Sequence, residues 1–409
     1  MLDQNTIFDV VIVGSGHAGA ALAISLRQKG FTGSILLTSD EATPPYERPP
    51  LSKEYLQGKI EDKQLLIRPE EFWTEQRITL ATGCAVNELN ASQRYVALTD
   101  GRTLGFNWCV LATGGKVRRL NCEGADLAGI HSLRNLADAK RIRDELTEVS
   151  QIAVIGAGYI GLEFAASARE LGKTVTVIET QDRVLSRVTS PEVASFLEEQ
   201  HVRRGVTFHF GQGVSALRGD GSLQSVILED GTLIPAQMAI CGIGIDAETD
   251  LAEAAGLDCD HGVLVDSCFR SSSPGILAIG DCSRHPNPFA GSLWRLESVQ
   301  HAQDSAETAA ALIMGDVAPY AQVPTFWSQQ YDLRLQSAGL NIDADDIIVR
   351  GTTGSTPFCA IYMRKGQIIA IDAINAPRDF MGARRLIQQG SKPDRSSLID
   401  TDIPLKSLV

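Results

Sequence analysis

Two glycine-rich turns in this sequence have the spacing of sites that bind the pyrophosphate of a dinucleotide. They are Gly14-Ser15-Gly16-His17-Ala18-Gly19 and Gly156-Ala157-Gly158-Tyr159-Ile160-Gly161. The first glycine of such a turn allows a tight bend, the second lets phosphate approach the backbone, and the third lets a helix pack closely on a strand. Asp40 and Glu179 follow the first glycines by 26 and 23 residues, where a carboxylate can bind ribose hydroxyls. The pattern predicts two dinucleotides, FAD and NAD(P), with hydride transfer between them.

Each turn lies between the elements that must hold it in place. Apolar strands are expected at 8–13 and 151–155, directly before the two turns. A run of small helix-forming residues follows each turn, and β-rich runs at 34–38 and 174–178 lead to the two acids. Two strand–turn–helix–strand units in one chain indicate two nucleotide-binding domains.

Two further features describe the rest of the chain. The pairs Asp100-Gly101 and Asp230-Gly231 separate alternating apolar stretches, so both are expected to be hairpin turns. The segment Pro319 to Pro324 has the composition of a domain boundary. Beyond it we expect short strands and a closing helix near Gly382 to Gln389.

Composition excludes several classes of protein. The 409 residues are 44% hydrophobic and 21% charged, as in folded globular proteins of two or three domains. No apolar run reaches the roughly 20 residues of a membrane span, and the first residues lack a signal-peptide pattern, so a cytoplasmic protein without a membrane partner is expected. The formal charge of −13 makes nucleic acid an unfavourable partner.

The eight cysteines argue against thiol chemistry and against a bound metal. None forms a Cys-x-x-Cys pair, and no His/Cys cluster has zinc spacing, so we expect free and mostly buried thiols and no metal site. Flavoenzymes that reduce disulfides or peroxides need cysteine beside the flavin. The region 40–76, which follows the first ribose acid, has none, and Cys282 has no partner near it in sequence.

The second acid bears on the choice of nicotinamide nucleotide. A carboxylate at Glu179 binds a ribose 2′-hydroxyl and repels a 2′-phosphate, which favours NADH over NADPH. Arg183 and Arg187 follow closely and argue in the other direction, unless they contact the adenine or pyrophosphate or are exposed to solvent. NADH is the prediction.

Four further segments carry a family resemblance. They are Pro45-Tyr46-Glu47-Arg48-Pro49-Pro50-Leu51-Ser52-Lys53, Leu111-Ala112-Thr113-Gly114, Ala278-Ile279-Gly280-Asp281 and Pro377-Arg378-Asp379-Phe380. With the two glycine turns, they make the chain resemble the FAD-dependent NADH:ferredoxin reductases of bacterial oxygenase systems, of the aromatic-ring dioxygenase and cytochrome P450 types. The resemblance covers essentially the whole chain.

The resemblance implies an α/β fold of the glutathione-reductase type. Two Rossmann-like domains, one for FAD and one for NAD, would be followed by a C-terminal α+β domain. The FAD domain would be discontinuous, at 1–114 and 245–320, with the NAD domain at 115–244 and the C-terminal domain at 321–409.

The resemblance also implies which residues contact the cofactors. On the FAD side they are Gly14, Gly16, Ala18, Asp40, Arg48, Lys53, Val86, Ala112, Gly114, Asp281, Val299 and Trp327. On the NAD side they are Gly156, Gly158, Tyr159, Ile160, Glu163, Glu179, Arg187, Gly244 and Glu297. Lys53 and Glu163 would have catalytic roles: a cation near the flavin stabilises the anionic reduced ring, and Glu163 would hold Lys53 in an ion pair and line the nicotinamide pocket.

The implied reaction is electron transfer. NADH would pass a hydride to FAD N5, and single electrons would then reduce a small [2Fe–2S] ferredoxin, Rieske-type or Cys-ligated, that feeds a terminal oxygenase. Basic residues suited to docking this ferredoxin are Arg118, Arg119, Arg378, Arg384 and Arg385.

Two alternatives remain open on sequence grounds. One is a different enzyme on the same scaffold: a monodehydroascorbate reductase, a nitrite reductase component or a stand-alone NADH oxidase. The other is a non-enzymatic FAD/NADH redox sensor resembling apoptosis-inducing factor, against which the absence of an extra targeting or basic segment argues mildly.

Overall fold

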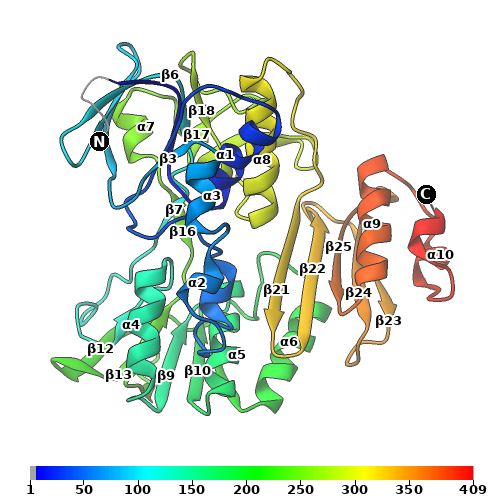
Figure 1. The fold of residues 1–409 in the computed structure, drawn as a ribbon. Coiled ribbons are helices and arrows are strands. Elements are labelled where there is room, and N and C mark those ends of the chain that lie inside the picture. The colour runs from blue at the N-terminus through cyan, green and yellow to red at the C-terminus, as the bar shows by residue number, and fades with distance from the viewer. Residues whose placement is uncertain (1–5, 409) are drawn as a thin grey trace. The chain divides into compact units, whose positions relative to one another are not determined.

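The computed structural model describes residues 6–408, and its chain forms two compact units (Figure 1). The first unit comprises the residues up to Glu47, Asp62–Lys116 and Ile245–Pro324. The second comprises Arg48–Glu61, Val117–Gly244 and the residues from Thr325 onward. Each unit is therefore assembled from three separate stretches of sequence.

A seven-stranded sheet forms the centre of the first unit. Its order is β3 (Ile78–Ala81), β2 (Ile35–Thr38), β1 (Ile7–Val13), β6 (Thr103–Leu111), β5 (Tyr95–Leu98) and β4 (Val86–Asn90), and β18 (Ile276–Ala278) also pairs with β6. The strands β3, β2, β1 and β6 are parallel, and Val10 to Val13 are all buried. Such an unbroken apolar run is typical of a parallel strand covered on both faces.

The remaining elements of the first unit surround this sheet. Helices α1 (His17–Gln28) and α8 (Val299–Ile313) pack against each other. The short helices are α2 (Asp62–Leu65), α3 (Glu70–Glu75), α7 (Asp250–Ala254) and the 3-10 turn η2 (Gly280–Cys282). A small sheet contains β17 (Val263–Leu264), β19 (Ser283–Asn287) and β20 (Ser292–Trp294), and the chain leaves the unit through β7 (Gly115–Val117) and re-enters at β16 (Ile245–Ala247).

The second unit contains a parallel sheet with its own helices. The sheet order is β11 (Val206–Phe210), β10 (Thr174–Glu179), β9 (Gln151–Ile155), β15 (Met238–Cys241) and β8 (Ile130–His131). The helices are α4 (Leu136–Leu146), α5 (Tyr159–Glu170) and α6 (Pro191–Arg203), and the 3-10 turn η1 (Pro49–Ser52) contacts α4 and α5. A separate antiparallel sheet is formed by β12 (Val214–Asp220), β13 (Ser222–Leu228) and β14 (Leu233–Pro235).

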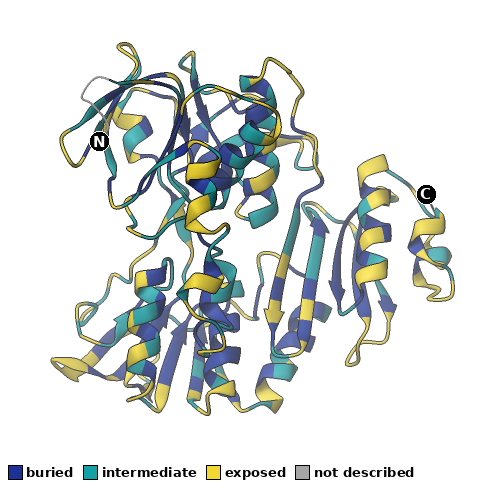
Figure 2. Cartoon of the chain, in the orientation of Figure 1, coloured by how far each residue is buried: buried dark blue, intermediate teal, exposed yellow. Residues whose placement is uncertain are grey.

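An antiparallel sheet completes the second unit. It has the order β21 (Thr325–Gln330), β22 (Leu333–Gly339), β25 (Gln367–Ile374), β24 (Phe358–Arg364) and β23 (Asp346–Gly351). Helix α9 (Pro377–Gln389) packs on β25 and β22, and α10 (Arg395–Ile399) and η3 (Leu405–Leu408) follow it. Within this sheet, β24 and β25 are almost entirely buried, whereas β21, β22 and β23 carry intermediate and exposed positions, and α9 has both buried and exposed positions (Figure 2).

The expected strands around both glycine turns and both Asp-Gly hairpins are confirmed. The expected closing helix was placed too late and is not the last element. Helix α9 begins at Pro377, since proline suits a first helical turn, and α10 and η3 follow it. Gly382 lies inside α9, where a Cβ would come within 2.8 Å of the Leu405 Cβ, so this glycine admits η3 to the helix surface.

All eight cysteines are free, and only Cys122 and Cys259 are not fully buried, which confirms the expected state of the thiols. Among the helices of residues 6–408, none is long and apolar enough to cross a membrane.

Candidate functional site

The first glycine turn, in the first unit, has a backbone that other residues cannot replace. Gly14 has φ +107°, and a Cβ there would lie 2.2 Å from the Ala112 carbonyl oxygen. A Cβ at Gly19 would lie 1.9 Å from the Gly14 carbonyl oxygen. The turn is therefore pressed against the end of β6 on one side and against the first turn of α1 on the other. This packing fixes the position of the N-terminus of α1, which begins after Gly16.

The second glycine turn repeats this geometry in the second unit. Gly156 has φ +102°, with the Gly242 carbonyl oxygen 2.5 Å from its ideal Cβ position, and Gly161 packs on Gly156 in the same way. Gly158 differs, because its φ is −78° and the nearest protein atom to an ideal Cβ is the Gly242 carbonyl oxygen, 4.0 Å away. Nothing in the protein requires glycine at this position. The space that a Cβ would fill lies before the helix, where a pyrophosphate binds.

The N-termini of the two helices that follow these turns have no side-chain cap. Helices α4, α6 and α8 are each capped by a side chain, from Asn135, Ser190 and Ser298. Helices α1 and α5 begin at Gly16 and Gly158 without any side-chain cap and without an acid in the first turn. Their free N–H groups and positive helix dipoles suit an anion. Both turns therefore fit the pyrophosphate of a dinucleotide.

Glu179 lies directly beside the second turn. Its Oε2 accepts a hydrogen bond from the Ala157 backbone N–H at 2.7 Å, and its Oε1 accepts one from the Gln181 N–H at 2.9 Å. The carboxylate thus stands at the end of β10, next to the helix end that would receive phosphate. In the loop that follows, Nη1 of Arg183 is buried without a hydrogen-bond partner, while Arg187 is exposed.

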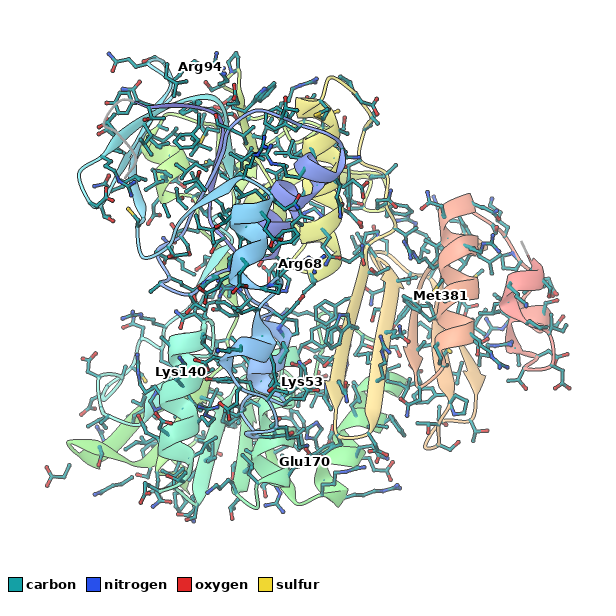
Figure 3. All side chains as sticks on the ribbon, viewed as in Figure 1. Lys53, Arg68, Arg94, Lys140, Glu170 and Met381 are labelled. Atoms are coloured by element: carbon teal, nitrogen blue, oxygen red, sulfur yellow. The ribbon has the colours of Figure 1, made fainter. Side chains whose placement is uncertain are left out.

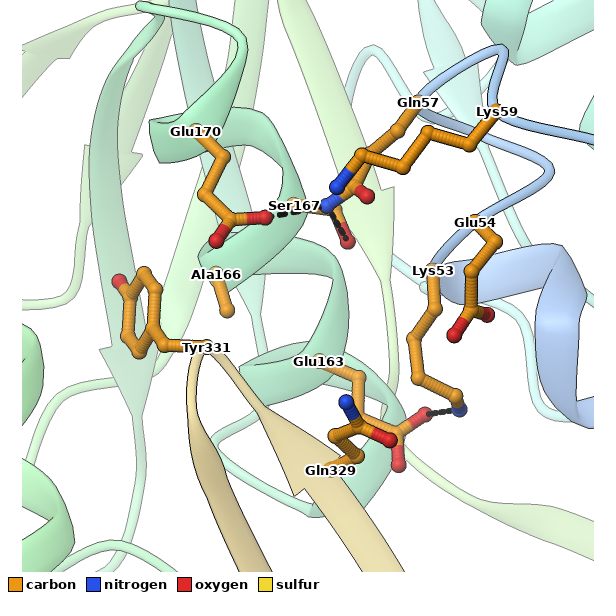
Figure 4. Close-up of a pocket in the computed structure, with 10 residues that line it drawn as sticks. All are labelled: Lys53, Glu54, Gln57, Lys59, Glu163, Ala166, Ser167, Glu170, Gln329 and Tyr331. Atoms are coloured by element: carbon orange, nitrogen blue, oxygen red, sulfur yellow. Dashed lines mark hydrogen bonds and ion pairs between the residues drawn. The ribbon is translucent and has the colours of Figure 1, made fainter.

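Lys53 and Glu163 form a buried ion pair in the second unit (Figure 4). The Lys53 Nζ lies 2.6 Å from the Glu163 Oε2, and the two residues are 7% and 4% exposed. This confirms the predicted pair. Ser52 Oγ donates to the same Glu163 oxygen at 2.6 Å, and Ser328 Oγ donates to the other at 2.8 Å. A charged pair buried in this way is held in one geometry by its hydrogen bonds.

Trp327 is the third predicted residue at this position. The Lys53 Nζ lies 5.2 Å from the centre of the Trp327 ring, within the range of a cation–π contact. Trp327 lies in β21 and is 37% exposed. Lys53, Glu163 and Trp327 therefore form one cluster, which we call the Lys53 cluster, with a buried cation and an exposed aromatic face.

A polar pocket adjoins the Lys53 cluster on the side of α5. Its lining side chains are Lys53, Glu54, Gln57, Lys59, Glu163, Ala166, Ser167, Glu170, Gln329 and Tyr331. Gln57 Nε2 donates to Glu170 Oε2 at 2.5 Å and to Ser167 Oγ at 3.3 Å, and Ser167 Oγ donates to the Ser52 carbonyl at 2.7 Å. These bonds tie the Lys53 segment to α5; Lys53 and Glu170 are labelled in Figure 3.

Of the other predicted residues of the first unit, Ala112 and Asp281 lie beside its glycine turn, whereas Val86 lies away from it. Ala112 lies behind Gly14, and a Cβ at Gly280 would lie 2.9 Å from the Ala18 Cβ, so the turn that carries Asp281 contacts the start of α1. Val299 is the first residue of α8. Val86 lies at the far end of the sheet, separated from β1 by β6 and β5.

The division into two structural units does not match the division into predicted FAD-contacting and NAD-contacting residues. Arg48, Lys53 and Trp327 were predicted on the FAD side and belong to the second unit, whereas Glu297, predicted on the NAD side, belongs to the first. Glu297 pairs with Arg295 at 2.7 Å. The residues that belong to the first unit are Gly14, Gly16, Ala18, Asp40, Val86, Ala112, Gly114, Asp281, Glu297 and Val299.

The segment 45–53, which carries much of the resemblance, makes contacts in both units. Within the first unit, His17 Nε2 lies 2.7 Å from Glu47 Oε2, and this hydrogen bond lowers the pKa of Glu47. Within the second unit, Arg48 Nη1 donates to the Arg134 carbonyl at 2.6 Å, and Lys53 reaches Glu163. Almost every polar side chain in this short stretch therefore has a defined partner.

Sequence reasoning missed the serines of the Lys53 cluster. Ser52 precedes Lys53 in the segment 45–53 that carries the resemblance, so its place in the sequence could have identified it as a member of the cluster. Ser328 and Ser167 left none, because serine is common and their partners are more than a hundred residues away in sequence. No group of three or more metal-ligating side chains gathers within residues 6–408.

Comparison with known proteins identifies relatives over the full length. Residues 8–306 match the pyridine nucleotide-disulphide oxidoreductase family, and residues 325–409 match the reductase C-terminal family. A ferredoxin–NAD(P)+ reductase from a Sphingomonas species is 44% identical over 408 residues, 99% of this chain and 98% of the relative. The ferredoxin reductase subunit of 5,5′-dehydrodivanillate O-demethylase from a Sphingobium species is 44% identical, covering 98% of each chain. The crystal structure of a covalent putidaredoxin reductase–putidaredoxin complex contains a chain 37% identical, with a TM-score of 0.94, covering 99% of this chain and 98% of that one.

Proposed function

Because this chain belongs to the pyridine nucleotide-disulphide oxidoreductase family, we propose that it is an NADH-dependent ferredoxin reductase that supplies electrons to an oxygenase. FAD and a nicotinamide nucleotide are the cofactors of this family. The observation that carries the proposal is the presence of two glycine turns, each aiming an uncapped helix end, together with a buried Lys53–Glu163 pair. The full-length relatives named as ferredoxin reductases support the choice of acceptor.

The state of the cysteines supports a one-electron acceptor over a disulfide. The region 40–76 has no cysteine, and all eight thiols are free. Burial raises the pKa of Cys109 to about 12, and it also raises the pKa of Cys282. Thiols with raised pKa values are poor nucleophiles at neutral pH. Electrons from the flavin therefore have no cysteine pair to pass through.

We assign cofactors to the domains as follows. Residues 1–114 and 245–320 would hold FAD, with its pyrophosphate at Gly14, Gly16 and Ala18 and its ribose at Asp40. Residues 115–244 would hold NADH, with its pyrophosphate at Gly158 to Ile160 and its ribose at Glu179. Residues 321–409 would form the C-terminal domain. The fit of both helix ends to phosphate supports these assignments.

The Lys53 cluster would act on the flavin by charge and by position. When bound, FAD accepts a hydride and releases single electrons. The ammonium of Lys53 would stabilise negative charge on the reduced ring, and it is held for this purpose by Glu163 and Ser52. Trp327 would lie along the ring with its exposed face, and Glu179 would select NADH by repelling a 2′-phosphate.

The ferredoxin would dock on basic residues of α9. Arg378 and Arg385 are exposed on this helix, and Met381 between them is 54% exposed (Figure 3). Two cations around an apolar side chain suit a locally acidic iron–sulfur protein. We also propose that the protein works in the cytoplasm.

An anaerobic experiment tests the proposal. The FAD-loaded protein is mixed with NADH or NADPH, and flavin bleaching is followed with and without an added [2Fe–2S] ferredoxin. Fast bleaching by NADH, then reoxidation that depends on ferredoxin, is the expected result. Fast bleaching without response to any ferredoxin would refute the acceptor and point to a small molecule or oxygen. A protein that takes up no FAD would refute the proposal as a whole.

A further inference from the structure

A line of buried polar side chains leads away from Glu163 inside the second unit. Ser328 Oγ donates to Glu163 Oε1 at 2.8 Å, and Gln330 Nε2 donates to Ser328 Oγ at 3.2 Å. Further along, His201 Nε2 lies 2.9 Å from Gln330 Oε1, and the Tyr331 hydroxyl lies 3.2 Å from His201 Nδ1. These four side chains, from Ser328 to Tyr331, are called the His201 network; Glu163 and Tyr331, at its two ends, are labelled in Figure 4. Ser328, Gln330 and His201 are at most 2% exposed.

The direction of every hydrogen bond in the His201 network follows from the carboxylate at its end. The ionised Glu163 offers only acceptor oxygens, so Ser328 uses its single proton there and accepts from Gln330. The amide of Gln330 then turns its Oε1 toward the histidine, so His201 Nε2 carries a proton. Burial lowers the pKa of His201 to about 4, so the ring is neutral at pH 7 and its Nδ1 accepts from the Tyr331 hydroxyl. All of these bonds therefore point toward Glu163.

The His201 network is not suited to carrying a proton away from Glu163. A hydroxyl or an imidazole can accept one proton and release another, whereas an amide such as that of Gln330 keeps both of its N–H protons. The network serves orientation instead, because hydrogen bonds that run in one direction polarise and strengthen one another. One carboxylate oxygen of Glu163 is thereby held by Lys53 and Ser52, and the other by the end of the network.

The tyrosine at the far end occupies a backbone position that favours glycine. The turn Tyr331-Asp332 joins β21 to β22 with two residues. Tyr331 has φ +56°, and glycine is preferred at the first position of such a turn because a side chain there crowds the backbone. The guanidinium of Arg204 lies 4.5 Å from the centre of the Tyr331 ring and pairs with Asp332 at 2.8 Å. The turn therefore accepts backbone strain while its tyrosine hydroxyl is placed against His201.

The tautomer of His201 decides which group the Ser328 hydroxyl contacts. If the ring proton moved from Nε2 to Nδ1, Nε2 would become an acceptor and the Gln330 amide would have to turn over. Its Oε1 would then face Ser328, whose hydroxyl would donate to that oxygen and leave Glu163. The Tyr331 hydroxyl donates to Nδ1 and so keeps the ring proton on Nε2.

We propose that His201 is a positioning residue for the Lys53–Glu163 pair. Through Gln330 it keeps the Ser328 hydroxyl on Glu163. The carboxylate in turn fixes the Lys53 ammonium, and a group that stabilises developing charge is effective only while it is held in place. This inference rests on the proposed function, in which Lys53 stabilises negative charge on the reduced flavin. It gives helix α6, which carries His201, a share in the rate of flavin reduction.

Anaerobic reduction of the FAD-loaded protein by NADH tests the proposal, because it yields the rate at saturating NADH and the Kd for NADH separately. His201→Phe removes the Nε2 donor but keeps a ring. It should lower the saturating rate roughly tenfold and leave the Kd within about twofold of wild type, since the residues proposed for pyrophosphate and ribose are untouched. Tyr331→Phe frees the tautomer of His201 and should lower the saturating rate about fivefold.

A rescue variant and a matched control separate positioning from general loss of structure. His201→Gln can place an amide donor where Nε2 lies, so it should bring the saturating rate to within about threefold of wild type. His131→Phe is the control, because His131 is also a buried histidine of the second unit, 2.8 Å from Glu145, and lies outside the His201 network. It should lower Tm and leave the rate and the Kd at wild-type values.

A second cut in the network checks that its members act together. Gln330→Met breaks the network next to Ser328 and should slow flavin reduction as much as His201→Phe does. The double variant should be no slower than either single variant, because both changes remove the same hold on Glu163. Additive losses would mean that the two side chains act separately and would overturn the proposal.

Saturating rates within about twofold of wild type in His201→Phe and Tyr331→Phe would also overturn the proposal, as would equal slowing in His201→Phe and His201→Gln. Where His201→Phe does not fold, Tyr331→Phe decides the matter alone, since it removes a single hydroxyl. Failure of the wild-type flavin to be reduced by NADH would instead refute the proposed function. Normal reduction of the wild type with unaffected variants would refute this inference alone.

Discussion

Replacing Glu163 with glutamine removes the charge opposite Lys53 while keeping nearly the same side-chain shape. In the native protein the Glu163 carboxylate accepts Lys53 Nζ at 2.6 Å, Ser52 Oγ at 2.6 Å and Ser328 Oγ at 2.8 Å. A glutamine can turn its carbonyl toward Lys53 and its amide toward Ser328, whose hydroxyl can rotate to accept. The geometry therefore survives, and the lost charge is the main change.

The size of the effect follows from burial. With side chains only 9% and 5% exposed, the pair is screened little by solvent. Removing one partner of a buried pair typically costs 3–5 kcal/mol, so we expect about 3 kcal/mol because the amide oxygen keeps a hydrogen bond to Lys53. For a unit of roughly 200 residues, this corresponds to a fall in Tm of about 6–12 °C.

Thermal unfolding of the FAD-loaded protein, followed by circular dichroism, measures this change. Ser328→Ala is the matched control, because it removes one neutral donor from the same carboxylate and should cost about 1 kcal/mol. Lys53→Met closes a double-mutant cycle. The double variant Lys53→Met/Glu163→Gln should lose at least about 2 kcal/mol less than the two single variants together.

Two results would show the reasoning to be wrong. One is a Tm of Glu163→Gln within about 2 °C of wild type, which would mean that Lys53 tolerates burial without a counter-charge. The other is additivity in the cycle, which would mean that the two side chains contribute separately and that their 2.6 Å contact carries no coupling.

Three further predictions concern selectivity, docking and pH. Glu179→Gln should lower the preference for NADH over NADPH, measured as the ratio of their Kd values, by about tenfold, because repulsion of the 2′-phosphate is lost. Arg384→Glu combined with Arg385→Glu should raise the KM for ferredoxin about tenfold at low salt and leave the rate of flavin reduction by NADH unchanged. Burial lowers the pKa of His285 to about 4 and of His301 to about 3, so both are neutral in the folded protein while the unfolded chain binds protons near pH 6.5. Stability from these two residues is full above pH 6.5 and falls as the pH drops, by up to about 1.4 kcal/mol per pH unit for each histidine, as the pH dependence of Tm would report.

Each of these has its own refuting result. An unchanged nucleotide preference would remove Glu179 from the ribose site. An unchanged KM would place ferredoxin docking away from the C-terminal half of α9. Replacement of both histidines by phenylalanine should flatten the fall in Tm between pH 6.5 and 5, and a slope that persists would assign it to other groups.

Much of the nucleotide-binding architecture could be predicted because its signals are local. The strand, the glycine turn and the small residues of the next helix are contiguous, and backbone conformation dictates them: only glycine tolerates the φ of +107° at Gly14 and of +102° at Gly156. Glu179 follows the second glycine turn after one helix and one strand, so the lengths of these two elements fix its spacing from the turn. The start of α9 at Pro377, by contrast, lies before the helix that the sequence predicts near Gly382 to Gln389.

Sequence alone thus determined the two turns, their strands, both hairpins and the absence of a cysteine pair. Only the tertiary structure decided which polar side chains bond to the same buried charged group. Ser328 reaches Glu163, and Thr189 reaches Asp372, across 165 and 183 residues of chain. The physical reason is that a turn is specified by the conformational preferences of adjacent residues, whereas a buried ion pair or carboxylate is specified by the folding of separate strands and helices around it. Hydroxyl groups that are unremarkable in sequence become specific partners once they share a dry interior with a charge.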